Sequence, residues 1–354
     1  FFHGTITTTM ADKRFNVFLL LITYIIFTGC SNLKKTTTLN KSLPVIFETD
    51  MGNDIDDAMA LDMLYKYADQ KLVKLLAVSS NKNNPSSAVY LDIMNTWYGY
   101  PKIPIGTVLN GADSEHDAIN YTKVVEGYMP AFKRTAKDST HYTESVALYR
   151  RILSKAADHS VVIISVGFST NLARLLDAEA DAYTTLNGKE LVAKKVKLLS
   201  VMAGNFEGKK IKEYNVVKDV PAARKLFKEW PTEIVVSPFE VGEQISYPAT
   251  SILNDFNWAA HHPMVIAYKS YAKMPYDRQT WDLTSVLYAV EGAHNYFTLS
   301  EAGTVEVSAD GFTSFISGRN GEHRYLKING EQAEHIKKRF IELVSARPTA
   351  LNYE

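Results

Sequence analysis

Apolar runs alternate with helical patterns along most of the chain. Strands that are buried on both faces are apolar at nearly every position, whereas helices repeat their apolar residues every three to four positions. Runs of the first kind occupy residues 44–49, 73–80, 103–109, 160–167, 196–204 and 232–238. Patterns of the second kind occupy residues 56–68, 87–99, 144–157, 170–178 and 220–230. This alternation predicts the α/β class, with an open, mostly parallel, Rossmann-like sheet flanked by helices.

The C-terminal part of the chain adds elements that do not alternate in this way. These are helices at 261–273, at 284–292 and from about Glu331, and short antiparallel strands at 303–311 and 323–330. No repeat and no clear linker interrupts the pattern. We therefore expect a single domain over residues 44–346, followed by a tail over residues 347–354.

The charge balance of the chain is neutral. Its 354 residues include 39 Lys and Arg against 39 Asp and Glu, so there is no basic excess to attract a nucleic acid. We therefore expect no nucleic-acid partner. Cys30 is the only cysteine, which leaves no partner for a disulfide within the chain.

The N-terminal segment has the pattern of a signal peptide. Two basic residues precede an apolar run from Phe15 to Phe27, which is short for a membrane-spanning helix. The run ends in "FTGC", which resembles the lipobox of bacterial lipoproteins. The resemblance implies a signal peptide over residues 1–29, a lipid on the thiol of Cys30 and a polar tether over residues 30–43. Such a protein would be anchored to a membrane in the bacterial periplasm or at the outer membrane. An uncleaved anchor and a plain secretory signal are the alternatives.

Four aspartates crowd the stretch "DMGNDIDD", directly after the first predicted strand. Like charges this close repel, and at a buried strand end they are stable only if a cation neutralises them or one keeps its proton. Ligands of open α/β sheets bind beyond the carboxyl ends of the strands, where this stretch lies. Carboxylate oxygens suit Ca²⁺ or Mg²⁺, and Ca²⁺ accepts the looser geometry. The stretch therefore predicts a site for a hard cation.

Three alternative roles for these acids fit the sequence less well. Capping of the following helix would account for only two of the four. An EF-hand loop that begins at Asp50 needs Gly and Glu where the chain has Ile55 and Leu61. A haloacid-dehalogenase-like phosphatase would have Asp-x-Asp after the strand, and here Glu48 takes the place of the nucleophile.

Polar, turn-forming stretches follow three more of the predicted strands. They are "SSNKNN", "GFSTN" and "GNFEGKKIKEYN". Because the carboxyl ends of parallel strands meet at one edge of a sheet, we expect these stretches to share a rim with the aspartates.

Four stretches, in this order, resemble the nucleoside hydrolase family of the inosine–uridine-preferring type. "ETDMGNDIDDAMAL" is similar to the Asp-x-Asp-Pro-Gly-x-Asp-Asp that opens that family, and "VGFSTNLARLL" to its Gly-Pro-Leu-Thr-Asn-Leu-Ala. "MAGNFEGKKIKEYNVVKDVPAARKLF" is similar to its Asn…Glu-x-Asn…Asp-x-x-Ala-Ala, and "WDLTSVLYAV" lies where the family has His-Asp before a helix. The four matches cover most of residues 44–345.

The resemblance implies a Ca²⁺ site that holds the ribose hydroxyls and a water molecule. The implied ligands are Asp50, Asp57, Asp282 and the carbonyl oxygen of Thr170. Three carboxylates and a carbonyl would leave room for the water and two hydroxyls in a shell of six to eight oxygens. Asp50 would also be the general base that takes a proton from the water.

The resemblance also implies the residues that bind the sugar. These are Asp56, Asn205, Glu213, Asn215 and one asparagine after the second strand. Asn84 is the first candidate for that asparagine, Asn81 and Asn83 are the alternatives, and ordinary turn chemistry is the competing role for all three. In "EYN", Glu213 and Asn215 are two positions apart, so an extended backbone would aim both side chains the same way.

The opening motif departs from the family pattern. Met51 replaces the Pro, and two extra residues separate Gly52 from the pair of aspartates. Asp54 has no family counterpart, and it could take the place of Asp56 or cap the turn.

Trp281 stands where many family members have a His that protonates the departing base. A tryptophan can stack on a base, but it cannot donate an acid proton. One possibility is that the leaving group needs little protonation, as with nicotinamide or nitrophenol. The other is a proton donor from elsewhere, for which His116, His261 and His262 are the candidates. We adopt the first hypothesis.

These observations predict a Ca²⁺-dependent enzyme that hydrolyses the N-glycosidic bond of ribonucleosides, or of a related ribosyl substrate, to ribose and free base. Such an activity belongs to purine and pyrimidine salvage. The alternative is a lipid-anchored protein that binds a ribosyl ligand without turnover. The aspartate set favours the enzyme, and the missing His favours the alternative. By analogy with relatives, a homo-oligomer is possible.

Overall fold

The structure, a computed structural model, describes residue 1 and residues 42–52, 54–112, 120–137, 139–319 and 321–349. Residues Lys41–Glu354 belong to one compact unit. Cys30, His116 and the expected signal peptide lie outside the described residues. Among the helices of the described part, none combines the length and the apolar character that a membrane crossing requires.

A large twisted sheet forms the centre of this unit. Its strands are β1 (Leu43–Thr49), β2 (Val73–Ser80), β3 (Ile105–Thr107), β4 (Thr143–Glu144), β5 (Val161–Val166), β6 (Val196–Met202), β7 (Glu233–Ser237), β10 (Thr298–Leu299), β11 (Gly303–Val307), β12 (Thr313–Ser317) and β13 (His323–Lys327). The strand order is β12-β11-β13-β7-β6-β5-β1-β2-β3-β4, with β10 beside β13. All pairs from β13 to β4 are parallel, whereas β10, β11 and β12 pair in antiparallel fashion.

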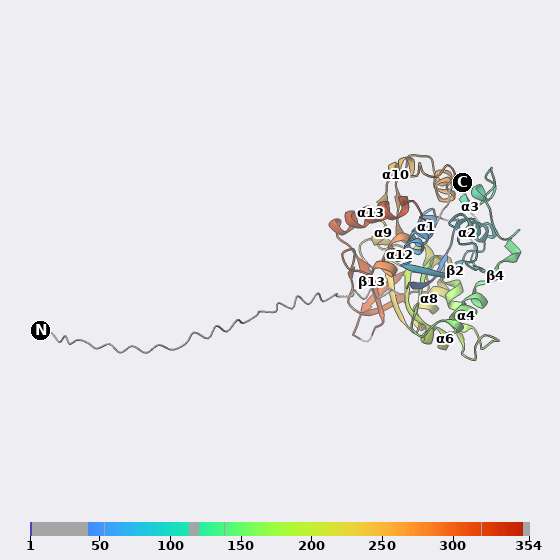
Figure 1. The fold of residues 1–354 in the computed structure, drawn as a ribbon. Coiled ribbons are helices and arrows are strands. Elements are labelled where there is room, and N and C mark those ends of the chain that lie inside the picture. Colours follow the sequence, from blue (N-terminus) through green and yellow to red (C-terminus); the bar gives the residue numbers. More distant parts are fainter. Residues whose placement is uncertain (2–41, 53, 113–119, 138, 320, 350–354) are drawn as a thin grey trace, which may run out of the picture. The chain divides into compact units, whose positions relative to one another are not determined.

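The helices pack on both faces of this sheet. They are α1 (Asp56–Asp69), α2 (Pro85–Trp97), α3 (Tyr121–Glu126), α4 (Ser145–Lys155), α5 (Thr170–Asp177), α6 (Gly188–Lys195), α7 (Tyr214–Lys218), α8 (Val220–Glu229), α9 (Phe239–Gly242), α10 (Ala249–Asn254), α11 (Pro263–Tyr271), α12 (Trp281–Glu291) and α13 (Gly330–Ser345). A 3-10 turn, η1 (Ser139–His141), and a small hairpin of β8 (Ser246–Tyr247) and β9 (Arg278–Gln279) complete the set. Figure 1 shows α1, α2 and α12 on one side of the sheet and α4, α6 and α8 on the other.

The alternation of side chains along β1 explains why both faces are covered. Val45 and Phe47 are fully buried in a core that includes residues of α1, α2, α12 and α13. Ile46, between them, is fully buried in a second core that includes residues of α4, α5, α6 and α8. Successive side chains of a strand point to opposite faces, so a strand covered on both sides must be apolar at nearly every position. The α/β prediction, with a mostly parallel sheet flanked by helices, is therefore confirmed.

The register brings the ends of the central strands to one edge. Thr49, the last residue of β1, lies beside Ser80 of β2 and beside Val166 of β5. The polar turns that follow these three strands therefore start at the same level, as expected from parallel pairing. This edge carries the candidate site.

Two predicted elements have different bounds in the structure, and one predicted conformation was wrong. The strand expected over 103–109 is only Ile105–Thr107, and α12 begins at Trp281 rather than at residue 284. The extended segment expected at "EYN" is the start of α7. The cause is Glu213, whose carboxylate accepts hydrogen bonds from the backbone N–H groups of Asn215 and Val216 and so caps a helix.

Candidate active site

A pocket of about 260 Å³ opens at the carboxyl ends of β1, β5 and β6. It is lined by Asp50, Asp54, Asp56, Asp57, Val166, Met202, Glu213, Tyr214, Asn215, Phe239, Tyr271, Trp281 and Asp282. Six of these residues are acidic and none is basic. The pocket can therefore attract a cation or a neutral, hydroxyl-rich ligand, but it disfavours a phosphate.

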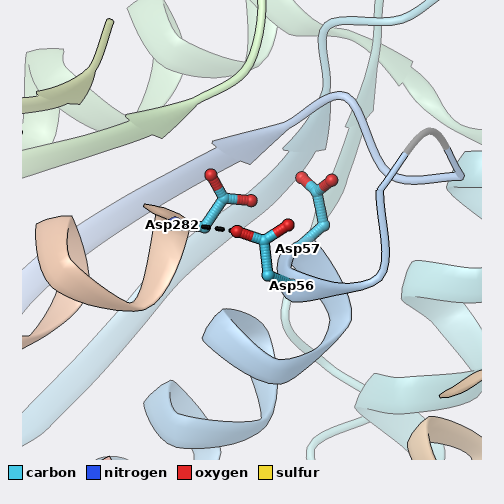
Figure 2. Close-up of side chains that lie close together, drawn as sticks. All are labelled: Asp56, Asp57 and Asp282. Atoms are coloured by element: carbon cyan, nitrogen blue, oxygen red, sulfur yellow. Dashed lines mark hydrogen bonds between the residues drawn. The ribbon is translucent and has the colours of Figure 1, made fainter. Parts of the chain in front are cut away.

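Three of the carboxylates that line this pocket lie close together (Figure 2). Asp56 and Asp57 come from the first turn of α1 and Asp282 from the first turn of α12, and their side chains point toward one another. One oxygen from each lies within 4.8 Å of the others, which is close enough to share one ion. All three are at least 96 % buried, since their exposed fractions are 1 %, 1 % and 4 %.

Neighbouring groups fix the direction of these carboxylates. The Thr49 hydroxyl, from the end of β1, donates a short hydrogen bond to Oδ1 of Asp57. The backbone N–H of Asp282 donates to Oδ2 of Asp56 at 3.1 Å, which ties the start of α12 to the start of α1 (Figure 2). The first turns of both helices thus meet at the acidic cluster, where their partial positive charges stabilise carboxylates.

Asp50 lies in the same pocket, although it is not part of the group of three. Its side chain is only 2 % exposed, and its Oδ2 has no hydrogen-bond partner among the described residues. A buried carboxylate oxygen without a donor is costly unless a proton or a cation occupies it. This oxygen is therefore available either to a cation or to a proton from water.

The pKa values of these groups show the cost of crowding them. Burial raises the pKa of Asp50 to about 7, although the nearby positive charge of Lys82 lowers it in part. Burial raises the pKa values of Asp56, Asp57 and Asp282 well above the usual range, and mutual repulsion among the acids adds to the effect. Without a cation, the cluster must hold protons.

The donor set fits a hard cation. It consists of carboxylate oxygens from Asp56, Asp57 and Asp282, together with the carboxylate of Asp50 in the same pocket, and it contains no sulfur or imidazole. Oxygen-only sites of this kind suit Ca²⁺ or Mg²⁺. The sequence-based ligand set had Asp50 with Asp57 and Asp282. In the structure, the carboxylate of Asp56 is the one grouped with those of Asp57 and Asp282, and Asp50 lines the same pocket.

Thr170, the fourth predicted ligand, does not line the pocket. It is the first residue of α5, is 3 % exposed, and its hydroxyl donates to Oδ2 of Asp219 at 2.6 Å. The ligand role of its carbonyl oxygen therefore stays a prediction.

The predicted sugar-binding residues lie partly in the pocket and partly behind it. Glu213 and Asn215 line it, and Glu213 is held by the backbone N–H groups of Gly204, Asn215 and Val216. Burial raises the pKa of Glu213 to about 7 even though these bonds lower it. Asn205 does not line the pocket, because its amide donates to Oε2 of Glu240 at 2.8 Å.

The three candidate asparagines after β2 have different environments. Asn84 caps α2, since its Oδ1 accepts a hydrogen bond from the Ser86 N–H at 3.1 Å, and it does not line the pocket. Asn83 is exposed. Asn81 is fully buried directly beneath the rim, where it contacts the turn after β5. Capping of α2 thus explains Asn84, whereas Asn81 contacts the turn after β5, which packs against Asp50.

Trp281 forms part of an aromatic wall. Its ring stacks on Phe239, with centroids 5.4 Å apart, and its indole N–H donates to the Phe239 carbonyl at 3.0 Å. Gly242 makes room for it, since a Cβ there would lie 2.5 Å from the Trp281 Cδ1. Tyr271 and Tyr214 also line the pocket. The one hydrogen that Trp281 could donate is therefore already bound within the protein.

Arg278 clamps this wall to the opening motif. Its guanidinium carbon lies 5.2 Å from the ring centroids of both Tyr271 and Trp281. Its Nε donates to Oδ1 of Asp54 at 2.7 Å, and its Nη2 forms a second, short bond to the same carboxylate. Asp54, which the family pattern left without a role, is thus the partner of Arg278, and its Oδ1 also accepts a hydrogen bond from the Ile55 N–H at 2.6 Å, as the turn-capping alternative expects.

Neither predicted histidine in the described residues lines the pocket. His261 accepts or donates a hydrogen bond with the Tyr128 hydroxyl at 3.2 Å. His262 is 2 % exposed and packs against Trp97, with ring centroids 4.1 Å apart. Phe239, Tyr271, Arg278 and Glu240 were not predicted, because no local motif marks them.

A model of the inosine-uridine preferring nucleoside hydrolase family matches residues 45–332 of this chain. A search of curated proteins found none that matches this chain. Among solved structures, a plant nucleoside hydrolase is similar with a TM-score of 0.67 and 18% sequence identity, covering 86% of this chain and 99% of its own. The inosine-uridine preferring nucleoside hydrolase of Bacillus anthracis has a TM-score of 0.64, 15% identity and coverage of 85% and 99%. A purine-preferring ribonucleoside hydrolase of Gardnerella vaginalis has a TM-score of 0.66, 16% identity and coverage of 85% and 98%. Identities this low show a shared fold.

The raised pKa values predict how stability depends on pH and on Ca²⁺. Without a cation, the stability that comes from holding a proton on Asp50 is complete below its ordinary pKa of 3.8 and is lost as pH rises through about 7. In the presence of a chelator, the protein should therefore unfold at a lower temperature at about pH 8 than at about pH 5. Ca²⁺ replaces these protons, so the increase in melting temperature that it causes should grow over the same range.

Thermal unfolding across this pH range, with chelator and with Ca²⁺, measures both effects. Asp92→Asn is the matched control, because Asp92 is equally buried and hydrogen-bonded but lies outside the pocket. It should keep the Ca²⁺ response of the wild type, whereas Asp282→Asn should lose most of it. If Ca²⁺ leaves the melting temperature unchanged at every pH, the assignment of a Ca²⁺ site to this pocket would be contradicted.

Proposed function

The chain belongs to the inosine-uridine preferring nucleoside hydrolase family, and from that premise we propose that it hydrolyses the N-glycosidic bond of ribonucleosides with Ca²⁺ as its cofactor. The products are ribose and the free base. The observation that carries the proposal is the convergence of Asp56, Asp57 and Asp282, together with Asp50, on one pocket at the strand ends. Structural similarity to nucleoside hydrolases supports it at the level of the fold.

The choice of Ca²⁺ rests on the kind and the crowding of the ligands. Carboxylates that come from three separate elements offer an irregular set of oxygens, which Ca²⁺ accepts more readily than Mg²⁺ does. Oxygens of Asp57, Asp282 and Asp50 would hold the ion, as the family resemblance implies. Asp56, whose Oδ2 already accepts a hydrogen bond from the Asp282 N–H, would be left for a ribose hydroxyl. When bound, it supplies a water of lowered pKa and ligand positions for ribose hydroxyls.

Asp50 is the general base of the proposed reaction. Its Oδ2 has no donor within the described protein, so a lone pair is available to take a proton from the attacking water. Burial and the adjacent carboxylates raise the pKa of this group toward neutrality, whereas a cation in the site and Lys82 lower it. The balance gives a base that is ionised at neutral pH and still able to accept a proton.

The remaining acids act on the sugar. Rupture of an N-glycosidic bond, like that of other glycosides, builds positive charge on the ring. Asp56, Glu213 and the amide oxygen of Asn215 surround the pocket and stabilise that charge, because they are fixed in place before the reaction. Asp56 and Glu213 also accept hydrogen bonds from ribose hydroxyls.

Purified protein should release ribose and base from inosine or uridine when Ca²⁺ is present and should lose this activity with chelator. Asp50→Asn should lower kcat by about 10²–10⁴-fold because the base is lost. Asp92→Asn, the buried control, should stay close to the wild type. Binding of the nucleoside with no release of ribose, in protein shown to contain Ca²⁺, would favour the alternative of a ribosyl-binding protein without turnover.

The departing base receives no proton from Trp281, because its indole N–H donates to the Phe239 carbonyl. No histidine occurs among the described residues that line the pocket. Arg278 lies behind the aromatic wall, but a guanidinium does not release its proton. Tyr214 and Tyr271 also line the pocket, but burial raises the pKa of the Tyr271 hydroxyl to about 12, which makes it a weak acid. The site therefore favours leaving groups that need little protonation.

We expect a nitrophenyl riboside to be cleaved at least about 10²-fold faster than inosine, the factor that a general acid commonly contributes. Trp281→His should narrow this gap by accelerating inosine cleavage alone. Trp281→Phe, which keeps a ring but adds no acid, should leave the gap unchanged. Similar rates for inosine and the nitrophenyl riboside in the unmutated protein would contradict the hypothesis. They would favour the alternative of a separate proton donor such as His116.

The "FTGC" stretch supports a further part of the proposal, that the protein is lipid-anchored through Cys30. In a bacterium that processes lipoproteins, the wild type should fractionate with membranes. Cys30→Ser removes the acceptor thiol and should lose the lipid. Equal partitioning of the two forms between soluble and membrane fractions would refute the anchor.

A further inference from the structure

A fully buried acid, Glu48, lies beneath the pocket without touching it. It is the penultimate residue of β1, has no exposed surface and does not line the pocket. Its side chain projects on the same face of β1 as Ile46, toward the core that contains Leu148 and Ile163. An apolar residue would suit this position, so a carboxyl group there needs a reason beyond packing.

Three donors from three different elements meet this carboxyl group. The Tyr149 hydroxyl of α4 donates to Oε2 at 2.8 Å, and the Ser165 hydroxyl of β5 donates to Oε1 at 2.7 Å. The amide of Asn81, in the turn after β2, donates to Oε1 at 3.5 Å. Glu48 thus joins a helix to the ends of three adjacent strands. Hydrogen bonds are directional, so this arrangement restrains the strand ends in a way that an apolar contact would not.

Asn81 passes this restraint on to the rim of the pocket. The side-chain Oδ1 of Asn81 accepts a hydrogen bond from the Phe168 N–H at 3.1 Å, and the backbone N–H of Asn81 donates to the Thr49 carbonyl at 2.9 Å. Phe168 lies in the turn between β5 and α5, and Thr49 immediately precedes Asp50. The turn after β5 is therefore tied to the side chain of Asn81, and the residue before Asp50 is tied to the backbone of Asn81.

Gly167 shows how tightly these parts fit. A Cβ at this residue would lie 2.5 Å from both the Asp50 backbone nitrogen and the Asn81 Oδ1. The backbone of the turn after β5 thus packs directly against Asp50 and Asn81.

We propose that Glu48 is a positioning residue of the cation site, which acts through Asn81 to fix Asp50 relative to the turn after β5. The inference rests on the proposed function, since it names what sets the geometry of that same site. Groups that orient metal ligands without touching the metal commonly change affinity by about 10–100-fold when they are removed. Glu48 therefore contributes to Ca²⁺ affinity, which a residue with a purely structural role would not do.

The test is a calorimetric titration of Ca²⁺ into cation-free protein, below the unfolding temperature of each variant. Glu48→Leu fills the space but removes the acceptor for all three donors, and it should weaken Ca²⁺ binding by about 10–100-fold. Glu48→Gln keeps an acceptor oxygen of the same shape and should restore most of the affinity. Asp92→Leu is the matched control, because it deletes an equally buried acid of α2 that accepts hydrogen bonds from Thr135 and Ala136, away from the pocket.

The outcomes separate the possible roles. If Glu48→Leu and Asp92→Leu both lower the melting temperature in chelator but only Glu48→Leu weakens Ca²⁺ binding, Glu48 positions the site. If Glu48→Leu binds Ca²⁺ as the wild type does, the inference is overturned and Glu48 is structural. If Glu48→Leu does not fold, Tyr149→Phe and Ser165→Ala decide, because each removes one donor and should weaken binding by several-fold. Unchanged affinity in both overturns the inference equally.

The wild type distinguishes this inference from the proposed function. A wild-type protein that binds Ca²⁺ and releases ribose, with unaltered affinity in the Glu48 variants, would remove the inference alone. A wild-type protein that takes up no Ca²⁺ would remove both.

Discussion

The repulsion among buried carboxylates is the constraint on which the rest of this structure depends. Asp56, Asp57 and Asp282 are almost completely buried and have oxygens within 4.8 Å of one another, and Asp50 lines the same pocket. The fold offsets part of this repulsion by aiming the first turns of α1 and α12 at the cluster. Burial and the remaining repulsion raise the pKa values of all four acids. Protons or a cation must therefore balance their charge.

The two ends of the pocket are built on different principles. One end is polar and acidic, and next to it Glu48 and Asn81 connect the ends of β1 and β2 to the turn after β5. The other end is aromatic, and two of the departures from the family pattern meet there. Asp54, from the lengthened opening motif, binds Arg278, and Arg278 lies against the ring of Trp281, which replaces the His. The result is an aromatic wall that can pack against a base, and the indole N–H of Trp281 in this wall is already bound to the Phe239 carbonyl.

The sequence was sufficient for features with a local signature and insufficient for those that depend on distant contacts. Strands buried on both faces are apolar throughout, so the sheet and the shared rim of polar turns could be predicted. Arg278 and Asp54 are 224 positions apart, and no periodicity marks such a pair. Asn84 and Glu213 show a second difficulty. Each matches a family motif, yet each also binds a backbone N–H at the start of a helix, and sequence alone does not separate these roles.

The central claim is that one cation balances the acids at the strand ends. Crystals grown with Ca²⁺ and a non-hydrolysable ribosyl ligand, measured for anomalous scattering, test it most directly. The account predicts one calcium peak at about 2.3–2.6 Å from oxygens of Asp57, Asp282 and Asp50, with ribose hydroxyls completing the shell. A structure in which the acids hydrogen-bond to one another and no cation lies between them, at saturating Ca²⁺, would contradict it.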